Sequence, residues 1–182
     1  MKEEIIESQK NKILVVLHAS TSHGPTYYKK YPKEFEKFTP VCKSVELANC
    51  TEQELINAYD NTILYTDFVI SQTIAKLKQL EDKYNTALFY ISDHGESLGE
   101  NGLYLHGTPY SLAPDHQTQV PMMTWFSSSF SKSKKINTDC LKHAAEKNSY
   151  SQDNIFHSML GIMDVETKVY NSGMDIFSRC RN

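Results

Sequence analysis

The sequence predicts an α/β fold built around a sheet whose strands are covered on both faces. Residues 86–92 form a short, mostly apolar run that ends abruptly in Ser-Asp-His-Gly-Glu, and such a run indicates a buried strand. Its apolar residues do not alternate with polar ones, which is typical of a parallel sheet. A second apolar run covers 12–19, and a long helical pattern lies between the two. Strand, helix and strand in this order predict a right-handed parallel crossover.

Length and composition favour a single globular domain over residues 1–182. A chain of 182 residues can bury a sizeable core, and 40% hydrophobic with 23% charged residues is typical of a folded protein. The net charge of -3 gives no reason to expect nucleic-acid binding. No run approaches the roughly 18 apolar residues of a membrane-spanning helix, and the acidic start does not fit a signal peptide. Taken alone, these features predict a protein that stays where it is made.

The helical pattern begins at a capping box, in which Thr51 is the N-cap and Glu54 occupies the third helical position. Apolar residues then recur every three or four positions, so we expect a helix from 51 to about 82. Asp60 and Asp67 share one face of it, where they face solvent, cap a neighbouring loop or border a site.

The remaining elements follow from composition. The segment 27–38 is rich in aromatic residues, and we expect short helices and irregular chain there. A long glycine-bearing loop is predicted from 95 to 119. A third strand (120–126), a surface connection (127–137) and two helices (139–147 and 152–163) complete the chain. No internal repeat or domain boundary is present in the sequence.

The cysteines leave the redox compartment open. Cys42 and Cys50 enclose a short polar segment, which could close as a disulfide in an oxidising compartment or hold two ordinary thiols. Cys140 and Cys180 lie far apart in sequence, and their state cannot be judged from it.

Candidate metal ligands gather at predicted strand ends. His18 ends the first strand, Asp93 and His94 end the second, and His23 and His106 lie in loops. Each histidine alone is more often structural, but parallel strands would bring several of them to one edge of the sheet. Imidazole nitrogen with carboxylate oxygen suits zinc or manganese, and such a metal commonly serves phosphoryl transfer or hydrolysis. The sequence contains no P-loop, GxSxG or GxGxxG motif.

Several long motifs occur in order: SHGPTYY (22–28), YDNT (59–62), SDHGESLGENG (92–102), LHG (105–107) and QVPM (119–122). Together they resemble the lipid A phosphoethanolamine transferases, which include the mobile colistin-resistance enzymes of the alkaline phosphatase/sulfatase superfamily. The resemblance implies a three-layer α/β/α sandwich, incomplete here at its N-terminal side. It also implies a catalytic domain on the periplasmic face of the inner membrane. That domain moves phosphoethanolamine from phosphatidylethanolamine to lipid A or a related glycolipid through a phospho-threonine.

The resemblance also implies roles for individual residues. Asp93 and His94 match two zinc ligands. His23 and His106 match catalytic histidines that bind the transferred phosphate group or a second zinc. Cys42 and Cys50 match a family disulfide. A histidine with an ordinary pKa near 6.5 can also move the leaving-group proton.

Part of the family pattern has no match in this chain. The nucleophilic threonine, an acidic zinc ligand and the membrane anchor match no residue of it. We therefore expect the C-terminal part of a transferase that works with a missing N-terminal half and has little activity alone. The alternatives are a non-catalytic remnant and a fragment of a sulfatase-type metal-dependent hydrolase. The acceptor stays open between lipid A, a core sugar and a protein.

Overall fold

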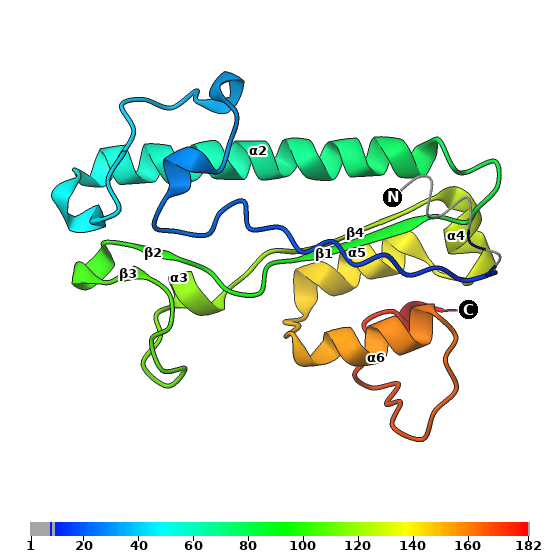
Figure 1. Ribbon diagram of the computed structural model, residues 1–182. Coiled ribbons are helices and arrows are strands. Elements are labelled where there is room, and N and C mark those ends of the chain that lie inside the picture. Colours follow the sequence, from blue (N-terminus) through cyan, green and yellow to red (C-terminus); the bar gives the residue numbers. More distant parts are fainter. Residues whose placement is uncertain (1–7, 9, 182) are drawn as a thin grey trace. The chain divides into compact units, whose positions relative to one another are not determined.

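The computed structural model describes residues 8 and 10–181, and the chain divides into two compact units. The site unit comprises Ala19–Phe126. The terminal unit joins the residues up to His18 to the segment that begins at Ser127. Each unit is described by itself below, and Figure 1 labels their helices and strands.

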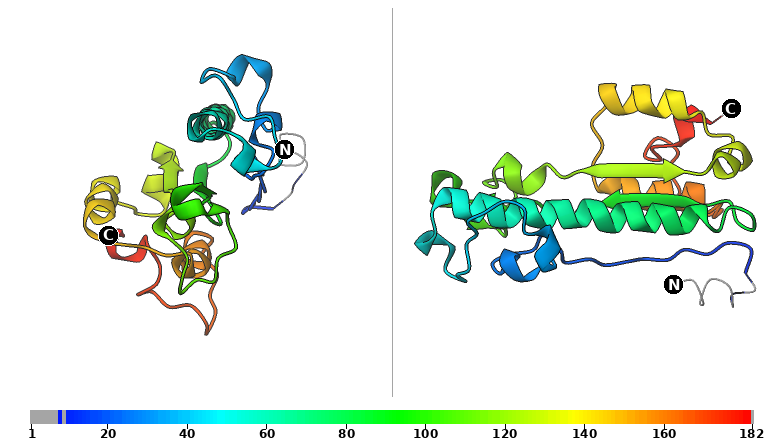
Figure 2. Two further views of the ribbon diagram at one scale, coloured as in Figure 1. Left: turned by 90° about the vertical axis from the view of Figure 1, so that its left-hand side faces the viewer. Right: turned by 90° about the horizontal axis from the view of Figure 1, so that it is seen from above.

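The site unit contains one long helix and two small antiparallel sheets. Strands β1 and β4 pair in one sheet, and β2 and β3 pair in the other. The axis of helix α2 lies roughly along the strands of the β1–β4 ribbon (Figure 1, Figure 2). In chain order the elements of this unit are η1 (Tyr27–Lys29), η2 (Lys33–Phe35), η3 (Leu47–Asn49), α2 (Glu52–Lys78), β1 (Ala87–Ile91), β2 (Ser97–Leu98), η4 (Glu100–Gly102), β3 (Tyr104–Leu105), α3 (Asp115–Thr118) and β4 (Met122–Phe126).

Helix α2 begins where the sequence predicts. The Thr51 side chain accepts a hydrogen bond from the Glu54 backbone N–H, and the Glu54 carboxylate accepts one from the Thr51 N–H at 2.9 Å. Both bonds of the capping box are therefore formed, which satisfies two donors that a helix start otherwise leaves free. The predicted helix is confirmed, although it ends at Lys78.

The core of the site unit lies between α2 and the segment that precedes it. Leu55 and Ala58 of α2 are buried with Tyr27, Cys42 and Leu47. The Cys42–Cys50 disulfide, which the family resemblance implied, is formed beside this core.

Asn61 fastens the irregular segment around residues 31–38 to α2. Its side chain is fully buried, with 0% exposed. Its Oδ1 accepts from the backbone N–H groups of Lys37 at 2.8 Å and Phe38 at 2.9 Å, and its Nδ2 donates to the Phe38 carbonyl at 2.9 Å. This segment forms no strand, so its backbone groups have no partners in a sheet. The buried amide of Asn61 supplies partners for three of them.

The strands are only partly as predicted. Strands β1 and β4 confirm the expected strands at 86–92 and 120–126. The strand predicted at 12–19 is wrong, because no residue there joins a ladder in the described chain. An apolar run becomes a strand only when a partner satisfies its backbone groups, and here Leu14, Val16 and Leu17 are instead exposed. The predicted parallel crossover, which needed that strand, is therefore also wrong for this chain, and β1 pairs with β4 in the antiparallel sense.

The terminal unit is helical and includes a second disulfide, Cys140–Cys180, which the sequence had left open. The Asn137 N–H donates to the Cys180 carbonyl at 2.8 Å, next to an antiparallel bridge between Ile136 and Arg181. The elements of this unit are α4 (Ser128–Ser133), α5 (Thr138–Lys147), α6 (Asp153–Ile162) and η5 (Ser178–Cys180). The helices predicted at 139–147 and 152–163 are confirmed as α5 and α6.

Across the helices of the described residues, none combines the length and the apolar character needed to span a membrane.

Candidate functional site

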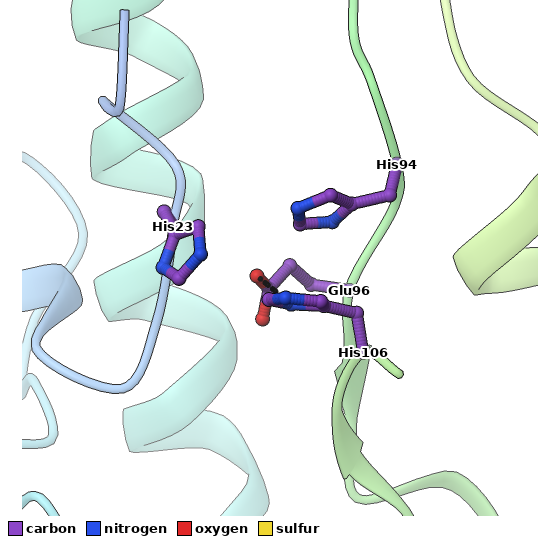
Figure 3. A group of neighbouring side chains, drawn as sticks. All are labelled: His23, His94, Glu96 and His106. Atoms are coloured by element: carbon purple, nitrogen blue, oxygen red, sulfur yellow. Dashed lines mark hydrogen bonds and ion pairs between the residues drawn. The ribbon is translucent and has the colours of Figure 1, made fainter. Parts of the chain in front are cut away.

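Four side chains of the site unit converge to form a group able to hold a metal ion: His23, His94, Glu96 and His106. One potential ligand atom of each lies within 4.8 Å of the others. Figure 3 shows His23 approaching from one side and the other three from the facing chain. The sequence places these residues in different loops, so the fold must bring them together.

Helix α2 positions the loop that carries His23. The Thr62 Oγ1 atom, fully buried on α2, lies 2.9 Å from Ser22 Oγ, and one turn later Thr66 Oγ1 lies 2.7 Å from Thr21 Oγ1. These two hydroxyl contacts hold the two residues that precede His23. The YDNT motif noted in the sequence therefore includes the residue, Thr62, that holds this loop.

Close backbone packing holds His94 after β1. The Gly95 N–H donates to the Gln117 carbonyl at 2.9 Å, and the Ser92 hydroxyl donates to the His94 carbonyl at 2.7 Å. A Cβ atom at position 95 would lie 1.9 Å from the His116 carbonyl oxygen. Only glycine permits this approach, which explains the Gly in the SDHGE motif.

The β2–β3 hairpin places Glu96 opposite His106. Ser97 pairs with Leu105 in the register of this hairpin, so the residues one step outward face each other across it. The turn includes Gly102, with φ of 75°, a conformation that glycine adopts without strain. The Asn101-Gly102 pair is a hairpin signal in the sequence, so the hairpin could have been predicted where an irregular loop was expected.

The three histidines of this group each use Nδ1 for a hydrogen bond to an oxygen atom of the protein. His23 Nδ1 lies 2.7 Å from the Gly24 carbonyl oxygen and His94 Nδ1 lies 3.0 Å from the Gly95 carbonyl oxygen. His106 Nδ1 lies 2.9 Å from Glu96 Oε1. Because carbonyl and carboxylate oxygens only accept, each Nδ1 carries the hydrogen. The Nε2 of each neutral ring is therefore the nitrogen left for a ligand.

The rings are packed against one another. The His94 and His106 rings are stacked with centroids 3.7 Å apart, and the His23 ring meets the His106 ring edge-on at 4.9 Å. The group therefore gathers three imidazoles within reach of one bound ion or phosphate group.

Asp93 lies beside this group and is not a member of it. Its side chain is 77% exposed, and its Oδ1 lies 3.9 Å from His94 Nε2. Two ligands that each lie about 2 Å from one zinc ion are roughly 3 to 4 Å apart. The separation between Asp93 and His94 is therefore compatible with one shared ion.

Of the predicted site residues, the structure brings His23, His94 and His106 together. His18 belongs to the terminal unit, and the strand that was expected to carry it to the site is not formed. Glu96 was not among the predicted site residues. Its position two residues after His94 in the SDHGE motif was the available signal.

A profile of the sulfatase family matches residues 1–165. The chain belongs to the sulfatase family. Its relatives include phosphoethanolamine transferase EptA of Escherichia coli K12, which is 49% identical over 179 residues, or 98% of this chain and 33% of that protein. Phosphatidylethanolamine transferase Mcr-1 of E. coli is 52% identical over 113 residues, or 62% of this chain and 21% of that protein.

A solved structure confirms the sulfatase-type α/β fold. The chain superposes on the integral membrane protein lipooligosaccharide phosphoethanolamine transferase A from Neisseria meningitidis with a TM-score of 0.95 and 45% identity. The match covers 100% of this chain and 34% of that one. This member of the sulfatase family thus matches between about a fifth and a third of the length of these relatives.

Proposed function

We propose that this chain forms part of a zinc-dependent phosphoethanolamine transferase, as a C-terminal portion of its catalytic domain. The enzyme would move phosphoethanolamine from phosphatidylethanolamine to lipid A or a related glycolipid. The names of the relatives support both substrates, since Mcr-1 is a phosphatidylethanolamine transferase and the Neisseria protein a lipooligosaccharide phosphoethanolamine transferase. The observation that carries the proposal is the group of three imidazoles whose Nδ1 atoms are all engaged, so that each Nε2 is available to a phosphate group or an ion.

The donor set near His94 fits zinc. An imidazole nitrogen and a carboxylate oxygen are ordinary zinc ligands, and His94 Nε2 and Asp93 Oδ1 are 3.9 Å apart. Asp93 and His94 would therefore hold the ion, together with ligands from outside this chain. When bound, zinc would act as a Lewis acid and lower the pKa of a coordinated hydroxyl.

His23 and His106 would act on the transferred group. Their rings lie edge to face with centroids 4.9 Å apart and come from two facing segments of the chain (Figure 3). Each Nε2 can hold a phosphoryl oxygen when it is protonated, or accept the leaving-group proton when it is not. Because Nδ1 of each ring is bound locally, such a proton exchange would take place at Nε2.

Two disulfides support a periplasmic location. Cys42–Cys50 and Cys140–Cys180 are both formed, and disulfides persist in oxidising compartments such as the bacterial periplasm.

The nucleophilic threonine and the further zinc ligands that the resemblance implies match no residue of this chain. We therefore expect the purified chain to have little or no transferase activity alone.

Zinc and headgroup binding by the purified chain test this proposal. We expect Asp93→Ala and His94→Ala to weaken zinc binding in calorimetry by at least tenfold. His23→Ala and His106→Ala should instead weaken binding of O-phosphoethanolamine to the zinc-loaded chain, measured by ³¹P NMR. His143→Ala, a change at an exposed histidine of the terminal unit, is the matched control. The proposal is refuted if the Asp93 and His94 variants bind zinc as the control does, or if the headgroup does not bind the unsubstituted chain.

A further inference from the structure

Glu96 is a buried carboxylate whose two oxygens are both engaged. Its side chain is 3% exposed. Oε2 accepts a hydrogen bond from the Tyr27 hydroxyl at 2.6 Å, and Oε1 lies 2.9 Å from His106 Nδ1. The Gly24 N–H makes a third, longer contact with Oε1 at 3.4 Å. Burying a carboxylate is unfavourable unless such donors surround it, and these three donors compensate the burial of Glu96.

Tyr27 anchors this carboxylate to the core. Its side chain is 1% exposed and lies in the cluster that includes Leu55 of α2. Burial, and then the bond to Glu96, raise the pKa of the Tyr27 hydroxyl far above its usual value. The hydroxyl therefore keeps its proton and acts as a fixed donor to Oε2. A hydrogen-bonded chain thus runs from the core through Glu96 to His106.

His106 differs from the other two histidines in the kind of acceptor it has. His23 and His94 donate to backbone carbonyls of adjacent residues, whereas His106 donates to a side chain ten positions away. A carboxylate behind an imidazole fixes its orientation and its tautomer. Because donors occupy both oxygens of Glu96, the carboxylate is better placed for this task than for binding an ion itself.

We propose that Glu96, held by Tyr27, is a positioning residue that keeps the hydrogen of His106 on Nδ1 and presents its Nε2 to the phosphate-bearing group. The identity of the group that His106 Nε2 contacts rests on the proposed function. The tautomer of His106 does not. Glu96 and Tyr27 touch neither substrate nor ion in this scheme. They act through His106.

The variant Glu96→Leu tests whether Glu96 controls the tautomer. Leucine is of similar length and offers no acceptor, so nothing at position 96 favours a hydrogen on His106 Nδ1. A neutral ring can then carry its hydrogen on either nitrogen. Glutamine is unsuitable here, because its amide oxygen can turn toward His106 Nδ1 while the Tyr27 hydroxyl accepts from its NH₂ group.

The tautomer can be read directly by long-range ¹H–¹⁵N NMR of the histidine-labelled, zinc-free chain above neutral pH. A His106→Asn variant identifies the His106 signals. We expect the Nδ1–H form in the unsubstituted chain, and a mixture of the Nδ1–H and Nε2–H forms in both Glu96→Leu and Tyr27→Phe. Glu100→Gln, which changes an exposed carboxylate on the same hairpin, and Tyr59→Phe, which removes a hydroxyl next to the Tyr27 ring, should leave the tautomer unchanged.

Binding supplies the second readout. We expect Glu96→Leu to weaken binding of O-phosphoethanolamine by about 10- to 100-fold, the usual effect of losing an orienting partner, and Glu100→Gln to leave it unchanged. An Nε2–H tautomer in the unsubstituted chain, or an unchanged Nδ1–H tautomer in Glu96→Leu, overturns the inference. If Glu96→Leu does not fold, Tyr27→Phe decides, and an unchanged single tautomer there overturns it equally. Failure of the headgroup to bind the unsubstituted chain, with the tautomers as expected, counts against the proposed function and not against the role of Glu96.

Discussion

Replacing Asn61 with alanine should destabilise the site unit more than any comparable change on the surface of α2. The side chain is fully buried and makes three hydrogen bonds of 2.8 to 2.9 Å with the backbone of Lys37 and Phe38. Each bond contributes about 1 kcal/mol net, and the groups left behind stay buried. Alanine favours the helix by about 0.6 kcal/mol relative to asparagine. We therefore expect the free energy of unfolding to fall by about 2 to 3 kcal/mol, a large part of the 5 to 15 kcal/mol typical of a domain.

Urea unfolding followed by the fluorescence of Trp125 measures this loss. Trp125 is the single tryptophan and lies in β4, so its signal reports on the site unit. With a slope of about 2 kcal/mol per molar urea, the midpoint should fall by about 1 to 1.5 M. Gln72→Ala, at an exposed position of the same helix, is the control and should change the midpoint little. A loss below about 1 kcal/mol, or one equal to the control, would refute the reasoning that Asn61 fastens the segment.

Three further predictions follow from single features. Gly95→Ala should lower the melting temperature or abolish folding, because its Cβ would lie 1.9 Å from the His116 carbonyl oxygen; a melting temperature within a degree of the unsubstituted chain would contradict this. Replacing both Cys42 and Cys50 with serine should lower the free energy of unfolding by about 2 to 3 kcal/mol, since the disulfide restricts the unfolded chain, and urea titrations with and without reductant check this. Burial and a carboxylate partner raise the pKa of Tyr27 in the folded state, so its contribution to stability is complete below about pH 10, the unfolded pKa, and is lost as the pH rises above it. Unfolding measured between pH 8 and 11 should show this decline, and Tyr27→Phe should make it shallower. Part of the decline should persist, because burial also raises the pKa of Tyr31, Tyr59, Tyr90 and Tyr170.

Local signals in the sequence were sufficient for some elements and insufficient for others. The capping box of Thr51 predicts the start of α2, because both partners lie within one turn. The apolar run at 12–19 resembles a strand as closely as the run that forms β1 does, but a strand also requires a partner, and none of the described residues supplies one. Pairing is a property of the whole fold, so it cannot be read from the run itself.

The site shows the same division. The histidine-bearing motifs predict that His23, His94 and His106 matter, and the structure brings these residues together. The burial of Glu96 depends on the hydroxyl of Tyr27, which is 69 positions away in sequence. A charged residue is exposed by default, so the sequence alone gave no physical reason to place Glu96 inside. The role of Glu96 could be inferred only from its contacts with Tyr27 and His106 in the structure.

The Cys140–Cys180 disulfide determines how the terminal unit would respond to proteolysis. It closes a loop of 40 positions that includes α6 and the exposed, irregular stretch around Val165 and Val169. A protease that cuts this stretch breaks the chain between the two cysteines, so both fragments stay covalently joined. The cut protein should migrate as one band on a non-reducing gel and as two after reduction. A cut in this stretch would therefore leave the peptide that carries η5 and Arg181 attached until the disulfide is reduced.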